Sequence, residues 1–208
     1  VKNADAFCTD AQWDKLYSPE ARELHVDDKR LVVLGADAAT KDDCCALVGV
    51  TWNDVLKKVE LVYAMIWYPG EGPINLTASI GPDIVRLHQH YRVVGCEYDP
   101  YQMQAIAEMC RRAGVNMVEF PQTSRRVQSD THLHRLLWGG NFVHYGAPDL
   151  KRHVTNAMSK DAERGRRIIK ELSSAKVDGA VALGMAALGA VELLTNVVSD
   201  EMKTQKNP

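Results

Sequence analysis

Leu31-Val-Val-Leu-Gly-Ala-Asp37 decides the fold class, because an unbroken apolar run ends there in a carboxylate. A run of this length, bounded by polar residues, is typical of a buried strand at the centre of a sheet. Two more apolar segments follow at 44–52 and 59–68, and the polar stretches between them are short. We therefore expect residues 31–36 and the two later segments to form an antiparallel three-stranded meander.

The pattern changes after this meander, since apolar segments of strand length alternate with amphipathic segments of helix length. Strands separated by helices pair in parallel, so we predict an α/β fold with one mixed sheet flanked by helices. The later strands are predicted at 93–98 and 115–120, with a short extended piece at 142–145. The predicted helices are 10–17 (with Thr9 as N-cap), 81–91, 100–113, 129–138, 149–158 and 179–196, and the charged stretch 159–176 is expected to be partly loop.

One domain accounts for most of the chain, which has 208 residues, 46% of them apolar. We place this domain at residues 31–198, after a polar leader or linker at 1–30 and before a flexible tail at 199–208. The apolar segment 179–194 contains Glu192 and is too short to cross a membrane, so it predicts a buried helix. Five cysteines without a CxxC pair indicate a reducing compartment rather than a disulfide framework or a zinc site.

Charge is distributed unevenly along the chain, although the formal net charge is only −2. Residues 111–176 hold 13 Lys and Arg against 6 Asp and Glu, whereas residues 1–60 hold 8 against 12. A basic half beside an acidic half suits a polyanion held near a carboxylate site, and it suits a solvated helix surface about equally well.

Three carboxylates occupy similar positions at the ends of apolar segments. Asp37 ends the first strand, Asp99 directly follows the strand 93–98, and Asp178 opens the last apolar helix. Each residue alone has a local explanation, because an aspartate before a helix commonly caps it. Three carboxylates that converge from two core strands and one helix instead suit hard divalent cations, which prefer oxygen ligands. Two such ions can stabilise both the attacking and the leaving oxygen of a phosphodiester.

Two more carboxylates are candidates for the same site. If the first hairpin turns near Thr40, Asp43 becomes a cross-strand neighbour of Asp37, where like charges favour a bound cation. A polar surface turn explains this segment equally well. Glu97 shares a strand face with Asp99 and is its rival for the second ligand position. Asp99 lies nearer the carboxyl end of the strand, where sites form in open α/β sheets.

These motifs resemble those of the nuclease domain of phage terminase large subunits. Segments 34–39 and 43–47 resemble the first hairpin of that family, 98–102 its second acidic strand, and 153–157 with 170–183 its C-terminal block. Ala6-Phe7 with Trp13 resembles the segment that joins the family's ATPase and nuclease domains. The resemblance extends over nearly the whole chain, and the three acidic motifs occur in the family's order.

The resemblance implies a five-stranded RNase H-like sheet and hydrolysis of phosphodiester bonds by two bound Mg²⁺ or Mn²⁺ ions. Carried over to this chain, the catalytic residues and metal ligands are Asp37, Asp99 and Asp178, with Asp43 as a further ligand. The implied substrate is concatemeric double-stranded viral DNA, cut during genome packaging in the cytoplasm of an infected bacterial host. The implied partners of the full-length protein are the portal and the terminase small subunit, and no membrane is involved.

The chain has no G-x-x-x-x-G-K-[ST] motif. We therefore expect it neither to bind a nucleotide nor to have the ATPase activity of the family, as in a separated nuclease domain.

Basic residues near the acidic motifs are the candidates for contacts to DNA phosphates. Lys170 lies in the matched C-terminal block, and the others are Arg125, Arg126, Lys151 and Arg152. Solubility explains each of these residues, taken alone, about equally well.

Three other functions remain open from the sequence. A resolvase-like nuclease that cuts branched DNA would share the fold and the metals. A sugar-kinase or actin-like ATP-binding module also begins with a strand ending in Asp, but it needs a glycine-rich loop that residues 38–41 do not provide. A non-catalytic packaging module would use the acidic residues only as helix caps.

Overall fold

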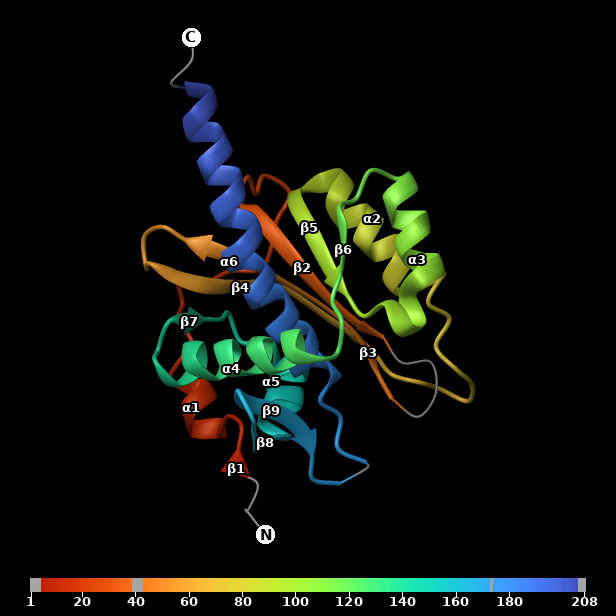
Figure 1. Cartoon of the computed structure of the whole chain (residues 1–208), viewed down its shortest axis with the longest axis vertical. Helices are drawn as coiled ribbons and strands as arrows, with labels where there is room; N and C mark the ends of the chain where they lie inside the picture. The colour runs from red at the N-terminus through yellow and green to blue at the C-terminus, as the bar shows by residue number, and fades with distance from the viewer. Residues whose placement is uncertain (1–4, 39–42, 173, 206–208) are drawn as a thin grey trace.

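A six-stranded mixed sheet forms the centre of the computed structural model, which describes residues 5–38, 43–172 and 174–205 (Figure 1). The strand order is β6-β5-β2-β3-β4-β7. The bounds are β2 Leu31–Ala38, β3 Cys45–Asn53, β4 Lys58–Trp67, β5 Arg92–Tyr98, β6 Met117–Glu119 and β7 Phe142–Val143. β2, β3 and β4 pair antiparallel, whereas β5, β6 and β7 each join in parallel. The predicted meander and the mixed α/β class are confirmed.

The sheet has one strand more than the five that the resemblance implied. β7 contributes it by pairing in parallel with β4, with Phe142 opposite Val59. The short extended piece predicted at 142–145 is therefore an edge strand. The predicted central position of the first strand is correct, because β2 lies between β5 and β3.

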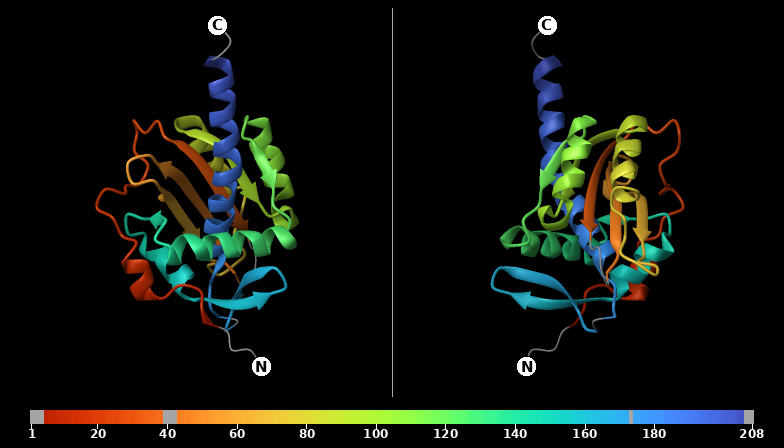
Figure 2. Two further views of the ribbon diagram at one scale, coloured as in Figure 1. Left: turned by 60° about the vertical axis from the view of Figure 1, so that its left-hand side comes forward. Right: turned by 90° about the vertical axis from the view of Figure 1, so that its right-hand side faces the viewer.

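Helices cover both faces of the sheet (Figure 2). Their bounds are α1 Asp10–Asp14, α2 Ile80–His90, α3 Pro100–Arg112, α4 Ser124–Trp138, α5 Pro148–Thr155 and α6 Asp178–Gln205. Alternate residues of β2 face opposite sides, so Val32 and Leu34 pack with α2 and α3, while Val33 packs with α4, α5 and α6. Burial on both faces explains why this strand is a continuous apolar run in the sequence.

α6 crosses the sheet in close contact with the two central strands. A Cβ atom at Gly35 would overlap the backbone oxygen of Ala182, and one at Gly189 would lie 2.8 Å from Cγ of Glu97. Glycine allows this approach because any larger residue would push the helix off the sheet. The first residue of α6, Asp178, is thereby held near the carboxyl end of β2.

A β-hairpin replaces the partial loop expected over 159–176. β8 (Ala157–Ala162) and β9 (Gly165–Lys170) pair antiparallel, and β1 (Asp5–Ala6) adds to β8 to form a second, three-stranded sheet. Gly165 follows the turn with a φ of +148°, a backbone conformation that favours glycine. The strand pattern is hidden because half of the positions of the hairpin carry charged side chains. α5 accordingly ends at Thr155, before the predicted end at residue 158.

The described residues before β2 pack against the domain. Phe7 and Trp13 are fully buried in the core that α4, α5 and α6 share with the sheet. α1 begins after Thr9, whose hydroxyl accepts a hydrogen bond from Gln12 N at 3.1 Å, as predicted for its N-cap. That residues 1–30 act as a linker to another domain stays a prediction.

Two helices are longer than predicted. α4 begins at Ser124 rather than Ser129, because buried polar residues, among them Arg126, interrupt its apolar periodicity. α6 continues to Gln205 rather than ending at 196, and residues 206–208 of the predicted tail lie outside the described part. Within the described residues, no helix combines the length and the apolarity that crossing a membrane requires.

Candidate metal centre

The carboxyl ends of β2 and β5 bring Asp37 and Asp99 to the same level of the sheet. The two strands are parallel neighbours with Ala36 opposite Tyr98, so the next residue of each strand is an aspartate. Asp99 also caps α3, since its Oδ1 accepts a hydrogen bond from Tyr101 N at 2.9 Å. The cap engages one oxygen of Asp99 and leaves Oδ2 for a second partner.

Neighbouring negative charges perturb Asp37. Its pKa is raised to about 7, first by burial and then by the carboxylate of Asp178, with smaller contributions from Asp99 and Asp43. The guanidinium of Arg126 acts in the opposite direction without cancelling them. Four carboxylates are therefore close enough to repel one another.

Asp178 is only 6% exposed. Burial, followed by the charge of Asp43, raises its pKa, while Lys170 and the backbone amide of Cys44 favour the ionised form. Its Oδ2 atom is buried and has no hydrogen-bond partner among the described residues. A buried carboxylate oxygen without a partner costs free energy, which a bound cation would recover.

Asp43 joins this group, but not as a cross-strand partner of Asp37. Asp37 lies opposite Ala46, so the predicted pairing is wrong: the strands turn later in the chain than Thr40. Residues 39–42, which include the predicted turn position Thr40, lie outside the described part. Asp43 is instead contacted by two ammonium groups, because Lys170 Nζ donates to Oδ2 and Lys176 Nζ donates to Oδ1 at 3.4 Å.

Glu97 is on the strand face of Asp99 but lies beneath α6. It is fully buried, and Arg125 donates to its Oε1 at 3.0 Å. Burial raises its pKa to about 7 although Arg125 opposes this. Asp99, by contrast, is among the charges that raise the pKa of Asp37. This arrangement favours Asp99 over Glu97 as the second ligand, an assignment that stays a prediction.

Two of the predicted DNA-binding cations are engaged within the fold. Arg125 bridges Glu97 and Glu192, at 3.0 and 2.9 Å. Arg126 is 8% exposed, and its Nε donates to Asp130 Oδ1 at 2.9 Å. Because Arg125 binds two carboxylates at once and Arg126 is buried, they are weaker candidates for phosphate contacts than the remaining three.

The other three cations lie on α5 and β9. Lys170, the last residue of β9, has the carboxylate contact described above. The side chain of Arg152 is 66% exposed and pairs with Asp149 one turn earlier. Lys151 binds Asp14 of α1 at 2.7 Å. Lys170 and Arg152 are therefore the cations of this set that are best placed to meet a phosphate.

Sequence reasoning missed three polar residues beside the carboxylates. Lys176 contacts Asp43, while Tyr68 follows β4 and forms a hydrogen bond with the buried His153. Lys176 precedes the third acidic motif and His153 opens another matched segment, so their positions offered a usable signal. Nothing in the sequence distinguishes Tyr68 from the other tyrosines.

The donor atoms of the group suit a hard divalent cation. Asp37, Asp43, Asp99 and Asp178 offer carboxylate oxygens, which Mg²⁺ prefers, and a cation would offset their repulsion. In the described part of the chain, no three His, Cys, Asp or Glu side chains are already arranged to hold a metal. Full coordination therefore requires side-chain movement, chiefly the release of Asp43 from its two lysines.

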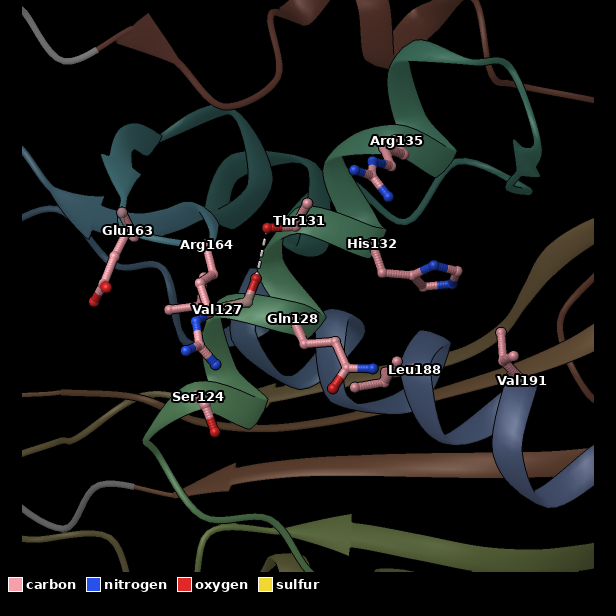
Figure 3. Close-up of a pocket in the computed structure, with 11 residues that line it drawn as sticks. Ser124, Val127, Gln128, Thr131, His132, Arg135, Glu163, Arg164, Leu188 and Val191 are labelled. Carbon is pink, nitrogen blue, oxygen red and sulfur yellow. Dashed lines mark hydrogen bonds between the residues drawn. The ribbon is translucent and has the colours of Figure 1, made fainter.

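A groove of about 750 Å³ lies apart from the carboxylates, between α4, the β8–β9 turn and α6 (Figure 3). Its lining combines the basic Arg135, Arg164 and His132 with the apolar Leu188 and Val191. None of the candidate metal ligands lines this groove. It is therefore not the predicted reaction site.

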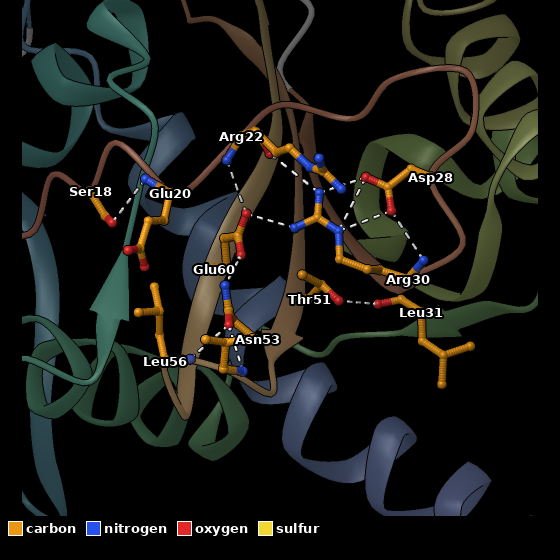
Figure 4. Close-up of polar contacts among 11 residues, drawn as sticks. Ser18, Glu20, Arg22, Asp28, Arg30, Leu31, Thr51, Asn53, Leu56 and Glu60 are labelled. Carbon is orange, nitrogen blue, oxygen red and sulfur yellow. Dashed lines mark hydrogen bonds and ion pairs between the residues drawn. The ribbon is translucent and has the colours of Figure 1, made fainter.

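A second acidic cluster lies at the opposite end of β2 (Figure 4). Glu60 of β4 is fully buried, and its Oε1 accepts hydrogen bonds from Arg30 Nη1 at 2.6 Å and Arg22 N at 3.1 Å. Its Oε2 accepts one from Asn53 Nδ2 at 2.6 Å. Arg30 Nε also donates to both oxygens of Asp28, at 2.9 and 3.1 Å. Each carboxylate here has a counter-charge inside the fold, which indicates a structural role.

The family model "Terminase large subunit, endonuclease domain" matches residues 71–192 of the chain. No curated protein matches the sequence.

Solved phage terminase structures share the fold. The HK97 bacteriophage large terminase has a TM-score of 0.74 at 18% identity, covering 89% of this chain and 43% of that one. The large terminase nuclease from thermophilic phage G20c with bound magnesium has a TM-score of 0.63 at 14% identity, covering 90% of this chain and 98% of that one. The Thermus phage P74-26 large terminase nuclease domain has a TM-score of 0.58 at 17% identity, covering 88% and 93%.

At these identities the likeness concerns the fold, and it supports the RNase H-like arrangement expected for the mixed sheet. The G20c nuclease is also solved with bound cobalt and with bound zinc. The chain spans less than half of the HK97 large terminase, at 43% of its length.

Proposed function

Because the chain belongs to the family of terminase large subunit endonuclease domains, we propose that it is a divalent-metal-dependent DNA endonuclease with Asp37, Asp99 and Asp178 as metal ligands. The family resemblance drawn from the acidic motifs is confirmed. The G20c nuclease binds magnesium, cobalt and zinc, and we extend divalent-metal binding to this chain.

One observation carries the proposal: unmatched negative charge collects where β2, β5 and α6 meet. Asp178 Oδ2 is buried without a partner in the described part of the chain, and neighbouring carboxylates contribute to raising the pKa of Asp37 to about 7. Converging carboxylates repel one another and destabilise the fold when no metal is bound, but the same arrangement attracts a cation.

Two Mg²⁺ or Mn²⁺ ions, when bound, supply an activated water and stabilise the charge on the leaving oxygen. In our proposal Asp37, Asp99 and Asp178 hold them, and Asp43 becomes a fourth ligand on leaving Lys170 and Lys176. The ammonium group of Lys170 then lies beside the site, where it binds the phosphate of the strand to be cut.

Family membership also supports a biological role, which we propose for the full-length protein. Its substrate is concatemeric double-stranded viral DNA, cut during genome packaging in the cytoplasm of the infected bacterium. Its partners are the portal and the terminase small subunit.

Plasmid cleavage tests the proposed activity. The purified chain should nick and linearise supercoiled DNA with Mg²⁺ or Mn²⁺, show weak sequence preference and be inactive in EDTA. Calorimetric metal titration should give binding that Asp178→Asn loses. Cleavage in EDTA would disprove the metal mechanism. Cleavage confined to branched DNA would favour a resolvase-like nuclease, and DNA binding without cleavage in any metal would favour a non-catalytic packaging module.

Charge reversal tests the DNA-facing cations. Lys170→Glu should weaken duplex binding and reduce the slope of log Kd against log salt by about one, the change expected when a single lysine–phosphate pair is removed. Lys151→Glu is the matched control, because this lysine is held on the α1 side by Asp14 and Asp10. If both variants changed duplex binding and its salt dependence equally, Lys170 would have no specific DNA contact and would serve only solubility.

A further inference from the structure

We propose that the hydroxyl of Tyr68 donates a hydrogen bond to a phosphate oxygen of the bound DNA strand, and that His153 orients it for this contact. This proposal rests on the proposed nuclease function, and it adds an uncharged contact to the lysine and arginine contacts proposed for the DNA phosphates. Tyr68 directly follows β4. Ile66 of β4 pairs with Ala46 of β3, which in turn pairs with Asp37 of β2. The tyrosine therefore stands at the same end of the sheet as the carboxylates.

Two hydrogen bonds fix the tautomer of His153. The residue is 1% exposed, and the backbone N–H of Gly179 donates to Nδ1 at 3.0 Å. A ring nitrogen that accepts carries no proton, so the proton of the neutral ring is on Nε2, 3.2 Å from the hydroxyl oxygen of Tyr68. Burial keeps the ring neutral by lowering the pKa of His153 to about 4. His153 therefore donates to Tyr68.

Because His153 is the donor, the hydroxyl proton of Tyr68 is not donated to His153. It has no acceptor among the described residues, and Tyr68 is 46% exposed. Burial, together with the charge of Asp149 and smaller effects of Cys44 and Asp178, raises the pKa of Tyr68, so the hydroxyl keeps its proton at neutral pH. An oriented and available donor thus lies beside the carboxylate group.

A phosphate oxygen is the acceptor that this donor meets when DNA occupies the site. The charge of Asp178, a proposed metal ligand, acts on Tyr68, and His153 contacts both Tyr68 and Gly179, the residue after Asp178. A strand whose scissile phosphate lies on the metals must pass its adjacent phosphates over the surrounding surface. Tyrosine hydroxyls commonly donate to DNA phosphates, and such contacts fix the position of the strand without reading its sequence.

His153 is a positioning residue in this arrangement, because the same ring also holds the start of α6. The N–H of Gly179 belongs to the first turn of the helix, where backbone donors lack intrahelical acceptors, and the preceding residue is Asp178. One buried ring thus fixes a substrate contact on one side and the segment of a metal ligand on the other.

A second tyrosine–histidine pair provides a control within the chain. His144 is 2% exposed, accepts from Gly146 N through Nδ1 at 3.1 Å, and lies with Nε2 2.9 Å from the carbonyl oxygen of Trp13. Its tautomer is therefore that of His153, but its proton goes to the backbone. Tyr17 packs against this ring and is 55% exposed, beside α1 rather than beside the carboxylates.

Tyr68→Phe tests the contact by removing only the hydroxyl. We expect the KM for duplex cleavage, and the Kd for DNA measured in Ca²⁺ or EDTA, to rise about 10-fold, the loss typical of one hydrogen bond to a charged group. The value of kcat should stay within about 2-fold, since the contact is equal in the ground and transition states. The slope of log Kd against log salt should not change, because no charge is removed. Tyr17→Phe should behave as the unmodified chain.

Two variants of His153 separate its two contacts. The side-chain oxygen of His153→Asn can replace Nδ1 as the acceptor for Gly179, whereas the amide N–H of His153→Gln can replace Nε2 as the donor to Tyr68. We expect His153→Gln to keep most of the DNA affinity and His153→Asn to lose as much as Tyr68→Phe. Combining His153→Asn with Tyr68→Phe should give no further loss, and melting temperatures exclude misfolding as the cause.

An unchanged Kd and KM for Tyr68→Phe would overturn the inference, and so would a fall in kcat at constant KM. Failure of the proposed function is a different result: the unmodified chain would bind DNA without cutting it. The Kd comparison of Tyr68→Phe with Tyr17→Phe would then still decide whether the hydroxyl contacts DNA.

Discussion

The two ends of β2 carry two acidic clusters with opposite electrostatics. At the amino end, both oxygens of the buried Glu60 accept hydrogen bonds, and Arg30 supplies a counter-charge. At the carboxyl end, Asp178 Oδ2 has no partner among the described residues, and nearby carboxylates help to raise the pKa of Asp37 to about 7. Burial of an acid is common to both ends. What differs is whether the cations of the fold satisfy the carboxylates: at the carboxyl end Lys170 and Lys176 contact Asp43, but among the described residues none binds Asp178 Oδ2.

The difference separates structural from functional acids on physical grounds. A buried charge with a complete set of partners stabilises one conformation, and its loss leaves the partner charge unpaired. A group of like charges without a cation among them destabilises the fold until a ligand binds. Substitutions at the two ends should therefore have opposite consequences for stability and activity.

The largest expected effect is loss of cleavage at the carboxyl end. Asp37→Asn, Asp99→Ala and Asp178→Asn should each lower plasmid cleavage at least about 1000-fold, since the metals supply several kcal/mol of transition-state stabilisation. Without metal, the melting temperatures of the two Asn variants should stay equal or rise, because repulsion is relieved. Near-normal turnover of any of the three variants would show that the ligands are misassigned.

The next effect concerns stability at the amino end. Glu60→Gln should lower the free energy of unfolding by about 3 kcal/mol, because it removes one of the two carboxylates that pair with Arg30 and leaves either Arg30 or Asn53 facing an amide N–H in a buried site. Urea denaturation measures this change, and the folded variant should still cut DNA at the normal rate. A variant of unchanged stability and no activity would reverse the roles assigned to the two clusters.

The sequence predicted the acids at the carboxyl end of β2 better than those at its amino end. Asp37, Asp99 and Asp178 each mark a boundary between an apolar segment and the next element, and the structure brings their segments together. Glu60 lies inside a strand, and its partners come from the loop before β2 and from a neighbouring strand, so no local pattern indicates it. The hairpin of β8 and β9 was missed for a related reason, since its charged residues obscure alternation.

Contacts that depend on strand register or on a hairpin could not be predicted from the sequence. The cross-strand pairing of Asp37 with Asp43 required the turn to be placed to the residue, and a small error changed the partner to Ala46. The two lysines on Asp43 come from segments more than 120 residues away, since the contact of Lys170 spans 127 positions. Such contacts follow from tertiary packing rather than from local propensity.

A smaller effect is the dependence of stability on pH without metal. Asp37 has a pKa raised from 3.8 to about 7, so the folded state binds the proton more tightly than the unfolded state. Its stabilising contribution is complete below about pH 4 and is lost as the pH rises to about 7. A pKa raised this far corresponds to about 4 kcal/mol for a fully buried group, and the partial exposure of the Asp37 side chain reduces this to about 2 kcal/mol. Glu97, raised from 4.5 to about 7, acts in the same direction.

Urea denaturation in EDTA between pH 4.5 and 8 measures this slope. Comparison with Asp37→Asn isolates the share of Asp37, because the variant cannot titrate there. Mg²⁺ should restore the stability of the unmodified chain at pH 8 but not that of the variant, since ligands bind metal in their ionised form. Parallel pH curves for the two proteins would contradict the raised pKa of Asp37.

A still smaller effect, on the rate of cleavage, is expected for Asp43→Ala. Cleavage should fall about 10-fold with Mg²⁺ and less with Mn²⁺, because Mg²⁺ demands nearly ideal octahedral geometry. The variant also releases Lys170 from its carboxylate, so its Kd for DNA should fall rather than rise. Kinetics in both ions and a binding assay check the two effects. Weaker DNA binding by the variant would show that Asp43 orders Lys170 instead of occupying it.

The smallest effect is expected for Glu97→Gln. Glu97 shares features with both clusters. One of its oxygens lacks a partner, as in Asp178, but the other accepts from Arg125, and Gly189 of α6 packs against its side chain. The amide oxygen of glutamine can still accept from Arg125, so the local structure should persist.

Glu97 lies level with Gly35, two residues before Asp37, which corresponds to about 7 Å along the strand. At that separation its charge does not reach a metal held by Asp37 and Asp99. Cleavage by Glu97→Gln should therefore stay within about 3-fold of normal in either ion, a change smaller than the effect of removing one hydrogen bond to a charged group. Asp99→Ala should be assayed in parallel. If Glu97→Gln were inactive and Asp99→Ala active, with both variants folded, the second ligand would be Glu97 rather than Asp99.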